Sequence, residues 1–398
     1  MFIGALSWPF LRLYVLTIMY FSANAILNVI IPLRGDSWGW ANTEIGIVMG
    51  AYLFTTMFLR PWAGQLIDRY GPVRILRLIL VINGLALLLY TFTGMEGYLL
   101  ARVLQGACTA FFSMALQLGI VDALPDKDRS QGLSMYSLFA SIPSMIGPLL
   151  ALGMWRSGDM TSFALTMITL AVVTGIAGFT VRMDNSREPE SGFTNRKTSF
   201  MRHLPQLYRN ADLFRSSMVM LGTSIVFGAI TTFVPLYADE IHDASAAVYL
   251  MLQAGTVVAA RFCLRKRIPS DGKWHAGFVM FNLIIVAIAS LCVSISPYTA
   301  GGVALFYLGA CLMGISQALL YPTLTSYLTF VLPQTSRNVM LGMFIAMADL
   351  GVSLGGAAMG PLADWTSYSF VYFLCAIVGF VLIGFASIKR KDEQFIQK

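Results

Sequence analysis

The sequence predicts an all-α polytopic membrane protein in which twelve transmembrane helices form two pseudo-symmetric six-helix bundles. Hydrophobic residues make up 57% of the 398 positions and charged residues only 12%, and the mean hydropathy is +0.70. A soluble domain carries about 25% charged residues, so this composition excludes a water-soluble enzyme. The apolar residues fall into stretches of about 20, the length of a helix that crosses a bilayer. An internal repeat divides these stretches into two sets of six.

Turn and polar residues divide the apolar stretches into twelve predicted helices. The first stretch is not predicted to be a signal peptide, because its apolar run over 13–33 is too long and no small-residue cleavage site follows it. Runs such as 75–89 do not alternate in polarity, which favours helices over barrel strands. The predicted helices span 9–33, 42–66, 74–93, 97–122, 131–155, 161–181, 213–237, 245–264, 276–296, 299–325, 338–362 and 367–388.

One long polar segment separates the sixth and seventh predicted helices. It contains too few apolar residues to form a core and is predicted to be a linker. The chain is therefore expected to comprise an N-terminal six-helix bundle over 1–182, a cytoplasmic linker over 183–212, a C-terminal six-helix bundle over 213–388 and a cytoplasmic tail over 389–398.

Lys and Arg residues are predicted to lie mostly on one side of the membrane. The loops after the even-numbered helices and the tail hold 22 of the 27 basic residues, when residues one turn inside the helices are counted with the loops. Positively charged loops stay in the cytoplasm, so both termini are predicted to be cytoplasmic in a multi-pass protein of a bacterial inner or plasma membrane. Topology accounts for the net charge of +7, and no nucleic-acid partner is predicted. Contacts with membrane lipid are expected, and the chain is predicted to be a monomer.

The two halves of the sequence contain an internal repeat. Arg60 recurs 201 positions later as Arg261, each near the exit of the second helix of its half. At an offset of 208, several residues in 106–135 match residues in 314–343. Because both offsets respect the predicted helix numbering, two parallel repeats are predicted.

A motif of glycines and charges links the second and third predicted helices. Glycine permits close approach of the chain, and a carboxylate beside guanidinium groups can form a charge latch. The segment 64–74 resembles the G-x-L-x-D-R-x-G-x-x-R signature of the major facilitator superfamily, a family of transporters. With the twelve helices and two halves, this resemblance covers almost the whole chain and implies alternating access to a small-molecule substrate. The residues of the predicted conformational latch are Gly64, Asp68, Arg69, Gly71 and Arg74.

Arg102 lies inside the fourth predicted helix. A charge within the membrane is costly unless it faces protein or water, and this cost favours a functional role. With Leu99, Gln105 and Gly106, Arg102 resembles the L-x-x-R-x-x-Q-G pattern of the superfamily's drug:proton antiporter group, and the resemblance implies proton coupling. The alternative is that Arg102 extends to the membrane interface and pairs with Glu96.

Asp349 is the only acidic residue in the middle of a predicted span. Its place in the eleventh predicted helix puts it near the midplane of the membrane. Burial favours the neutral carboxyl group, whereas a cationic ligand or an arginine favours the charged form, which is the behaviour that a proton-coupled site requires. We therefore predict that Asp349 and Arg102 couple transport to protons. A purely structural ion pair is the alternative for Asp349.

The fifth predicted helix contains Pro143, Gly147 and Pro148. Proline removes a backbone hydrogen bond and permits bending, while glycine lets helices approach closely. Gly147-Pro148 partly resembles the G-P signature of the superfamily's exporters, which implies a hinge and outward transport, although the glycine pair that follows in that signature is missing here. Packing of an ordinary kinked helix is the alternative.

Polar residues within the predicted helices are candidates for lining a central cavity. Arg60 and Arg261 can bind a substrate carboxylate, form an inner gate or contact a lipid headgroup. Asn24 and Asn28 are four residues apart and therefore share a helix face. A hydrogen bond between helices is the alternative for each uncharged candidate. The other predicted substrate-binding residues are Tyr52, Gln117, Tyr136, Gln253, Gln317 and Tyr321.

Transport is the leading functional class, since central polar groups between two repeated bundles suit alternating access. No phosphate-binding G-x-x-x-x-G-K-[ST] motif occurs, so coupling to protons rather than to ATP hydrolysis is predicted. Segments 8–14, 110–119 and 321–328 resemble exporters of nicotianamine-like opine metallophores. That resemblance implies a proton-coupled secondary active exporter of a small polar zwitterionic metallophore.

Two other functions stay open. The 22 Met and 27 Phe residues also suit the adaptable pocket of a broad-specificity multidrug efflux antiporter for lipophilic cations. A membrane receptor or scaffold that transports nothing is the alternative from a different class. An enzyme is not predicted, because no Ser/His or paired-Asp arrangement occurs at a plausible depth. No cofactor and no metal site are predicted, because the five Cys and three His residues show no ligand spacing.

Overall fold

The structure is a computed structural model that describes residues 7–158, 160–180, 207, 210–264, 267–269, 271–334 and 337–387. The elements in these residues are helices. The long ones are α1 (Trp8–Ser37), α2 (Asn42–Tyr70), α3 (Pro72–Phe92), α4 (Met95–Ala123), α5 (Asp126–Arg156), α6 (Met160–Thr180), α8 (Ala211–Tyr237), α9 (Ala246–Cys263), α10 (Ala276–Ile295), α11 (Gly302–Val331), α12 (Arg337–Ala357) and α14 (Tyr368–Ser387). The short ones are α13 (Met359–Trp365) and the single-turn 3-10 helices η1 (Ala238–Glu240) and η3 (Ser296–Tyr298).

All twelve predicted helices are present, which confirms the predicted all-α fold. Several are longer than predicted: α5 begins at Asp126 rather than at 131, and α11 ends at Val331 rather than at 325. The added turn of α5 is polar, because a helix can continue into the membrane interface after its apolar stretch ends. Hydropathy alone therefore makes these helices too short, with a start that is too late in α5 and an end that is too early in α11.

The eleventh predicted helix, 338–362, differs from the prediction because it is divided into α12 and α13 at Ala358. Glycines stand on both sides of this break. A Cβ atom added at Gly356 or Gly360 would press against the backbone of α2. The break thus lies where two helices pack backbone to backbone, a contact that only small residues permit.

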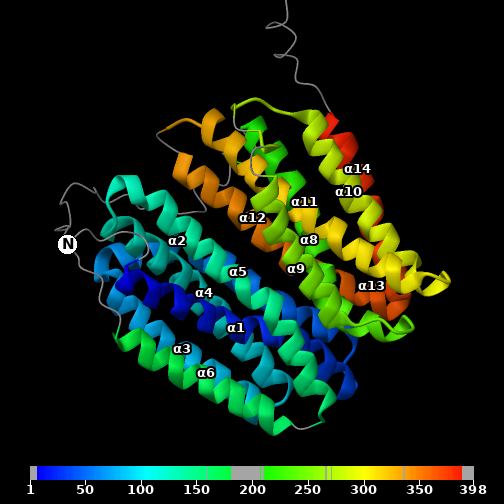
Figure 1. The fold of residues 1–398 in the computed structure, drawn as a ribbon, viewed down its shortest axis with the longest axis horizontal. Helices are drawn as coiled ribbons and strands as arrows, with labels where there is room; N and C mark the ends of the chain where they lie inside the picture. Colours follow the sequence, from blue (N-terminus) through cyan, green and yellow to red (C-terminus); the bar gives the residue numbers. More distant parts are fainter. Residues whose placement is uncertain are drawn as a thin grey trace, which may run out of the picture.

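The long helices form two groups that lie side by side (Figure 1). The N-terminal bundle comprises α1 to α6, drawn from blue to green, and the C-terminal bundle comprises α8 to α14, drawn from green to red. Within the first, α2 packs on α4, and α3 packs on α4 and α6; within the second, α9 and α10 pack on α11, and α8 packs on α12. The bundles meet where α2 contacts α12 and α13, α5 contacts α9, and α1 contacts α8.

Among the described helices, 11 are long and apolar enough to cross a membrane. The long helix outside this set is α2, whose 29 residues include Arg60, Gln65 and Arg69. This helix contacts α4 in its own bundle and α12 in the other. Polar side chains on α2 therefore have protein neighbours, which lowers the cost of placing them within the membrane.

Two predicted segments fall on residues that the structure does not describe. The predicted linker over 183–212 lies outside the described residues except for 207 and 210–212, and the predicted tail over 389–398 lies outside them entirely. The boundaries of the bundles over 1–182 and 213–388 and the cytoplasmic location of the termini stay predictions.

Helix contacts reproduce the internal repeat of the sequence. A Cβ atom added at Gly106 on α4 would collide with the backbone carbonyl of Tyr52 on α2, and one added at Gly314 on α11 would lie 2.6 Å from that of Gln253 on α9. The two glycines are 208 positions apart and their partners 201 positions apart, the two offsets of the repeat. The second and fourth helices of each half therefore pack at equivalent points.

We expect Gly106→Ala and Gly314→Ala each to lower the free energy of unfolding by about 1–3 kcal/mol, because the added methyl groups overpack two backbone contacts. Thermal unfolding of the purified variants in detergent measures this change. Gly175→Ala on α6 is the matched control, since a Cβ atom there meets nothing within 4 Å and alanine favours the helix. Equal stability of all three variants would contradict the close packing at the repeat.

Candidate functional site

An ion pair joins the two bundles. Arg60 Nε on α2 donates to Asp349 Oδ2 on α12 over 2.8 Å, and the side chains of Arg60 and Asp349 are 26% and 14% exposed. Asp349 lies in the middle third of the candidate span Val339–Trp365, as its place in the sequence indicated. A carboxylate at this depth is expensive without a partner, and here its partner comes from the other bundle.

Three tyrosines from three helices surround the ion pair. Tyr52 on α2, Tyr136 on α5 and Tyr321 on α11 lie close enough to Arg60 to interact with its charge. We call these five residues the central cluster. It draws on both bundles, so a ligand bound there would contact both.

Arg102 is fully buried, with 0% of its surface exposed. Its Nη1 donates to Asn24 Oδ1 over 2.7 Å and its Nη2 to Asn28 Oδ1 over 2.9 Å. The Arg102 Cζ atom lies 5.3 Å from the centroid of the Tyr52 ring. Asn24 and Asn28, predicted to bind substrate, thus hold the guanidinium group with their side-chain oxygens, and Tyr52 links Arg102 to the central cluster.

The alternative interpretation of Arg102, extension to the membrane interface with Glu96 as its partner, is wrong. Burial excludes the extension. Within the described part of the chain, neither Glu96 nor any other carboxylate lies within ion-pair distance of Arg102, and Arg102 Nε has no hydrogen-bond acceptor there. The positive charge of Arg102 is therefore solvated by amide oxygens and an aromatic face but is not neutralised.

Two hydroxyl neighbours were missed by sequence reasoning. Thr109 Oγ1 lies 3.0 Å from both Tyr52 Oη and Tyr20 Oη, so a chain of hydroxyl groups leads from α2 through α4 to α1. Tyr20 precedes Asn24 by four residues, and Thr109 follows Arg102 by seven, so each shares a helix face with a residue already singled out. That spacing was the available signal.

The other predicted substrate-binding residues lie near the central cluster or pair with one another. Gln117 lies within hydrogen-bonding range of Tyr136. Gln253 Nε2 donates to Gln317 Oε1 over 3.4 Å, which joins α9 to α11 within one bundle. Arg261 is exposed near the end of α9, close enough to Tyr321 for their charges to interact.

The end of the molecule that carries the α1–α2 turn is closed by Asp364 on α13. Its carboxylate accepts hydrogen bonds from the backbone N–H of Asn42 over 2.7 Å, the backbone N–H of Thr43 over 2.9 Å and the Thr43 hydroxyl over 2.6 Å. Asp364 therefore caps the N-terminus of α2 from the other bundle. This role usually belongs to the residue just before the helix. No pattern in the sequence predicts this contact, because the two segments are 322 positions apart.

Backbone contacts between α2 and α12 continue inward from this closed end. A Cβ atom added at Gly46 would collide with the carbonyl of Gly356, and one added at Gly50 would lie 2.6 Å from that of Ser353. At Gly64, about one turn beyond Arg60 toward the α2–α3 end, a Cβ atom would meet nothing within 4 Å. The close helix contact is thus on the side of the α1–α2 turn.

The predicted latch lies around the turn between α2 and α3. Gly71 has φ of +83° and forms the junction of the two helices, a conformation that glycine adopts without strain. The Arg69 Cζ atom lies 5.3 Å from the ring centroid of Tyr70, and Arg74 is exposed. The side chain of Asp68 lies outside the described residues, so the charge latch stays a prediction.

The corresponding turn of the C-terminal bundle has the same backbone feature. Gly272, the repeat mate of the latch glycine, has φ of +73°. Beside it, the ring of His275 lies with Nε2 2.8 Å from Asp271 Oδ1, and this hydrogen bond holds the pKa of the Asp271 carboxyl below its usual value. The charge pattern of the turn therefore differs between the two halves.

The predicted hinge lies within an unbroken helix. Pro143 and Pro148 are both inside α5. A Cβ atom added at Gly147 would lie 2.5 Å from the Cβ atom of Ala25 on α1. The glycine thus serves close packing of α5 on α1, and bending at the prolines stays a prediction.

Within the described residues, no group of three or more His, Cys, Asp and Glu side chains is placed to hold a metal ion.

The family profile described as Major Facilitator Superfamily matches residues 13–306 of the sequence. The chain belongs to this superfamily. It is 52% identical over 389 residues to the staphylopine export protein of Staphylococcus aureus, and the match covers 97% of this chain and 97% of that protein. The chain is therefore a multi-pass membrane transporter and not an enzyme.

Solved structures of other transporters share the fold of this transporter. A bacterial homologue of the human lysosomal transporter Spinster, in an inward-facing and occupied conformation, matches with a TM-score of 0.71 at 14% identity, over 94% of this chain and 95% of that one. The nucleoside transporter NupG matches with a TM-score of 0.71 at 13% identity, over 96% of this chain and 100% of that one. Identities this low concern the fold alone.

We expect a double-mutant cycle on Arg60→Gln and Asp349→Asn to give a coupling free energy of about 1–2 kcal/mol in unfolding experiments, because either single change leaves a charge without its partner. The value is at the lower end for buried pairs because both side chains are partly exposed. The double variant should lose less stability than the sum of the losses in the two single variants. Strictly additive effects would show that the pair contributes nothing to joining the bundles.

Proposed function

We propose that this transporter exports a small polar zwitterionic metallophore, an opine of the staphylopine type, in exchange for protons. The near-complete match to a staphylopine export protein at 52% identity supports the substrate class. The observation that carries the proposal is the charge of the site: Arg60, Arg102 and Arg261 stand against the single carboxylate of Asp349.

This charge balance favours a substrate with carboxylate groups. Arginine binds carboxylates with two parallel hydrogen bonds, and a guanidinium without a carboxylate partner is available to do so. Asp349 offers one position for an ammonium group. A lipophilic cation would meet an excess of positive charge, so the multidrug alternative is the less favoured interpretation.

In the proposed coupling, Arg60 and Asp349 pair with each other when the binding site holds no substrate. A zwitterion inserted between the two side chains gives its carboxylate to Arg60 and its ammonium group to Asp349, so no charge is left alone. When the site opens to the outside, a proton binds Asp349 and releases the ammonium group. After return to the inside, Asp349 loses the proton and pairs with Arg60 again. Substrate and proton thus compete for one carboxylate, which is the requirement for antiport.

The proposed motion is a rocking of the two bundles about the central cluster, in a monomer. The distribution of Lys and Arg supports a cytoplasmic α2–α3 end and cytoplasmic termini. The end closed by Asp364 is then extracellular, and the described conformation is the one that takes substrate from the cytoplasm. Arg102, held by Asn24 and Asn28, supplies a fixed positive charge beside the site and keeps Tyr52 in place.

We expect Asp349→Asn to reduce proton-driven export at least about tenfold, because an amide can neither form an ion pair with the ammonium group of the substrate nor bind a proton in its place. The measurement is uptake of a synthetic opine metallophore into inverted membrane vesicles that carry an imposed pH gradient, acidic inside. Asp243→Asn, which removes one exposed carboxylate far from the site, is the matched control and should transport as the wild type does. Unchanged transport by Asp349→Asn would remove Asp349 from the mechanism.

The same vesicles separate the three functional classes. Transport of the opine without transport of a dye such as ethidium supports the proposal. Transport of ethidium alone would instead support the multidrug alternative. If the folded, purified protein moves neither solute in liposomes, the receptor or scaffold alternative would be favoured.

We expect Asp364→Ala to shift the conformational equilibrium about tenfold toward a state that is open at the α1–α2 end. Loss of a helix cap costs about 0.5–2 kcal/mol, and 1.4 kcal/mol corresponds to a factor of ten. Spin labels on Ser37→Cys and Ala300→Cys, one exposed residue at this end of each bundle, report the distance by double electron–electron resonance after exposed Cys263 has been replaced. Asp243→Asn should leave the distances unchanged, since asparagine tolerates the φ of +60° at this position, and an unchanged distribution in Asp364→Ala would refute the closing role of Asp364.

A further inference from the structure

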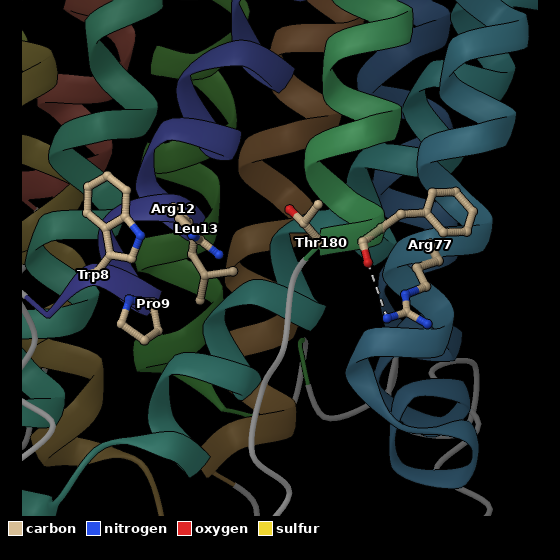
Figure 2. Close-up of a pocket in the computed structure, with 7 residues that line it drawn as sticks. Trp8, Pro9, Arg12, Leu13, Arg77 and Thr180 are labelled. Atoms are coloured by element: carbon tan, nitrogen blue, oxygen red, sulfur yellow. Dashed lines mark hydrogen bonds between the residues drawn. The ribbon is translucent and has the colours of Figure 1, made fainter. Parts of the chain in front are cut away.

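A second polar site lies at the rim of the N-terminal bundle, away from the central cluster. A cavity of ≈ 590 Å³ opens between the start of α1, the start of α3 and the end of α6. Figure 2 shows Trp8 and Arg12 from α1 on one side of it and Arg77, beside the end of α6, on the other. The proposed export mechanism uses none of these residues.

The cavity carries positive charge without a counter-charge. Arg12 and Arg77 are the charged residues that line it, and neither forms an ion pair with a described residue. Arg77 Nη2 donates to the Phe179 carbonyl over 3.3 Å, while Arg77 Nε is buried and has no acceptor among the described residues. Two guanidinium groups with unused donors on facing walls form a site for a phosphate, which arginine binds with two parallel hydrogen bonds.

Aromatic rings hold the two arginines in place. The Arg12 Cζ atom lies 5.4 Å from the centroid of the Trp8 ring, and the Arg77 Cζ atom lies 5.8 Å from that of the Phe179 ring. A cation over an aromatic face is stabilised while its N–H groups stay free in the plane of the guanidinium. The site is therefore partly preorganised for an anion before one binds.

An apolar surface runs from the cavity along α6. Leu165, Val172, Ile176 and Phe179 are each more than half exposed, and their spacing of seven, four and three residues places them on one helix face. Phe179 belongs to this stripe and also lines the cavity. A ligand with an anionic headgroup and acyl chains would contact both features, whereas a soluble anion would contact only the cavity.

The position of the cavity fits the membrane interface. It lies at one end of the candidate spans Trp8–Ser37, Pro72–Phe92 and Met160–Thr180, and Trp8, which is 67% exposed, is of a type that gathers at headgroup depth. We propose that Arg12 and Arg77 bind the phosphate of an anionic phospholipid whose acyl chains lie along the α6 stripe. The bound headgroup would tie α1 to α3 and α6 within one bundle.

Native mass spectrometry of the purified full-length transporter in detergent tests this site, with dioleoylphosphatidylglycerol and dioleoylphosphatidylcholine as probes. We expect the wild type to bind phosphatidylglycerol at least about tenfold more tightly than phosphatidylcholine. Arg12→Gln/Arg77→Gln should reduce this preference to about twofold or less. Arg267→Gln removes an exposed arginine at the same end of the other bundle and should keep the preference. A thermal unfolding midpoint close to that of the wild type shows that the double variant is folded.

Three outcomes would overturn the proposal. An unchanged preference in the double variant would place lipid binding elsewhere. Binding of soluble sn-glycerol 1-phosphate as tightly as phosphatidylglycerol would identify a site for free phosphate esters. The third outcome is a wild type that binds both lipids equally and a triple variant, Asp184→Asn/Glu188→Gln/Glu190→Gln, that prefers phosphatidylglycerol. This outcome would show that acidic residues of the chain itself occupy the site. Each result leaves the proposed export function untouched, because the central cluster contributes no residue to this cavity.

Discussion

The ion pair between Arg60 and Asp349 is the constraint on which the rest of the site depends. A carboxylate at this depth is stable only beside a cation, and the cation comes from the opposite bundle. The pair therefore does two things at once: it solvates a charge in the membrane, and it sets how the two bundles meet. Any ligand that takes either partner must replace the lost interaction and thereby changes the contact between the bundles. Binding and conformational change are linked through these two side chains.

The sequence predicted the fold well because the bilayer imposes it. Stretches of about 20 apolar residues are typical of spanning helices, so the apolar stretches and the turn residues between them predicted all twelve. Hydropathy failed at the start of α5, which depends on the membrane interface, and at the break at Ala358, which depends on packing against α2. The repeat was also predictable, since close backbone contacts at Gly106 and Gly314 admit no side chain in either half.

The site was predictable only at residues whose charge has a free-energy cost within a membrane span. Asp349 and Arg102 stand out in the sequence because charge within a span has a cost that needs a reason. Their partners do not stand out. Arg60 was assigned several roles, and Asn24 and Asn28 were expected to meet substrate, whereas they bind Arg102. Asp364 lies between two predicted helices and drew no prediction, and only the tertiary structure brings its carboxylate to the start of α2. Pairings between distant segments are set by the arrangement of bundles, which local patterns do not encode.

Departures from the repeat concentrate in the chemistry rather than in the packing. Gly106 and Gly314 keep one contact in both halves, while Arg102 has Ala310 as its mate and Asp349 has Ser141. Two equivalent bundles can rock against each other because they share a packing scheme, but they cannot both hold the same charges at a common centre without repulsion or mutual neutralisation. Asp349 on the C-terminal bundle, with Arg60 and Arg102 on the N-terminal bundle, makes the interface attractive in only one register. Symmetric packing then allows the motion, and asymmetric charge gives the substrate a defined orientation, with its carboxylate toward the N-terminal bundle and its ammonium group toward α12.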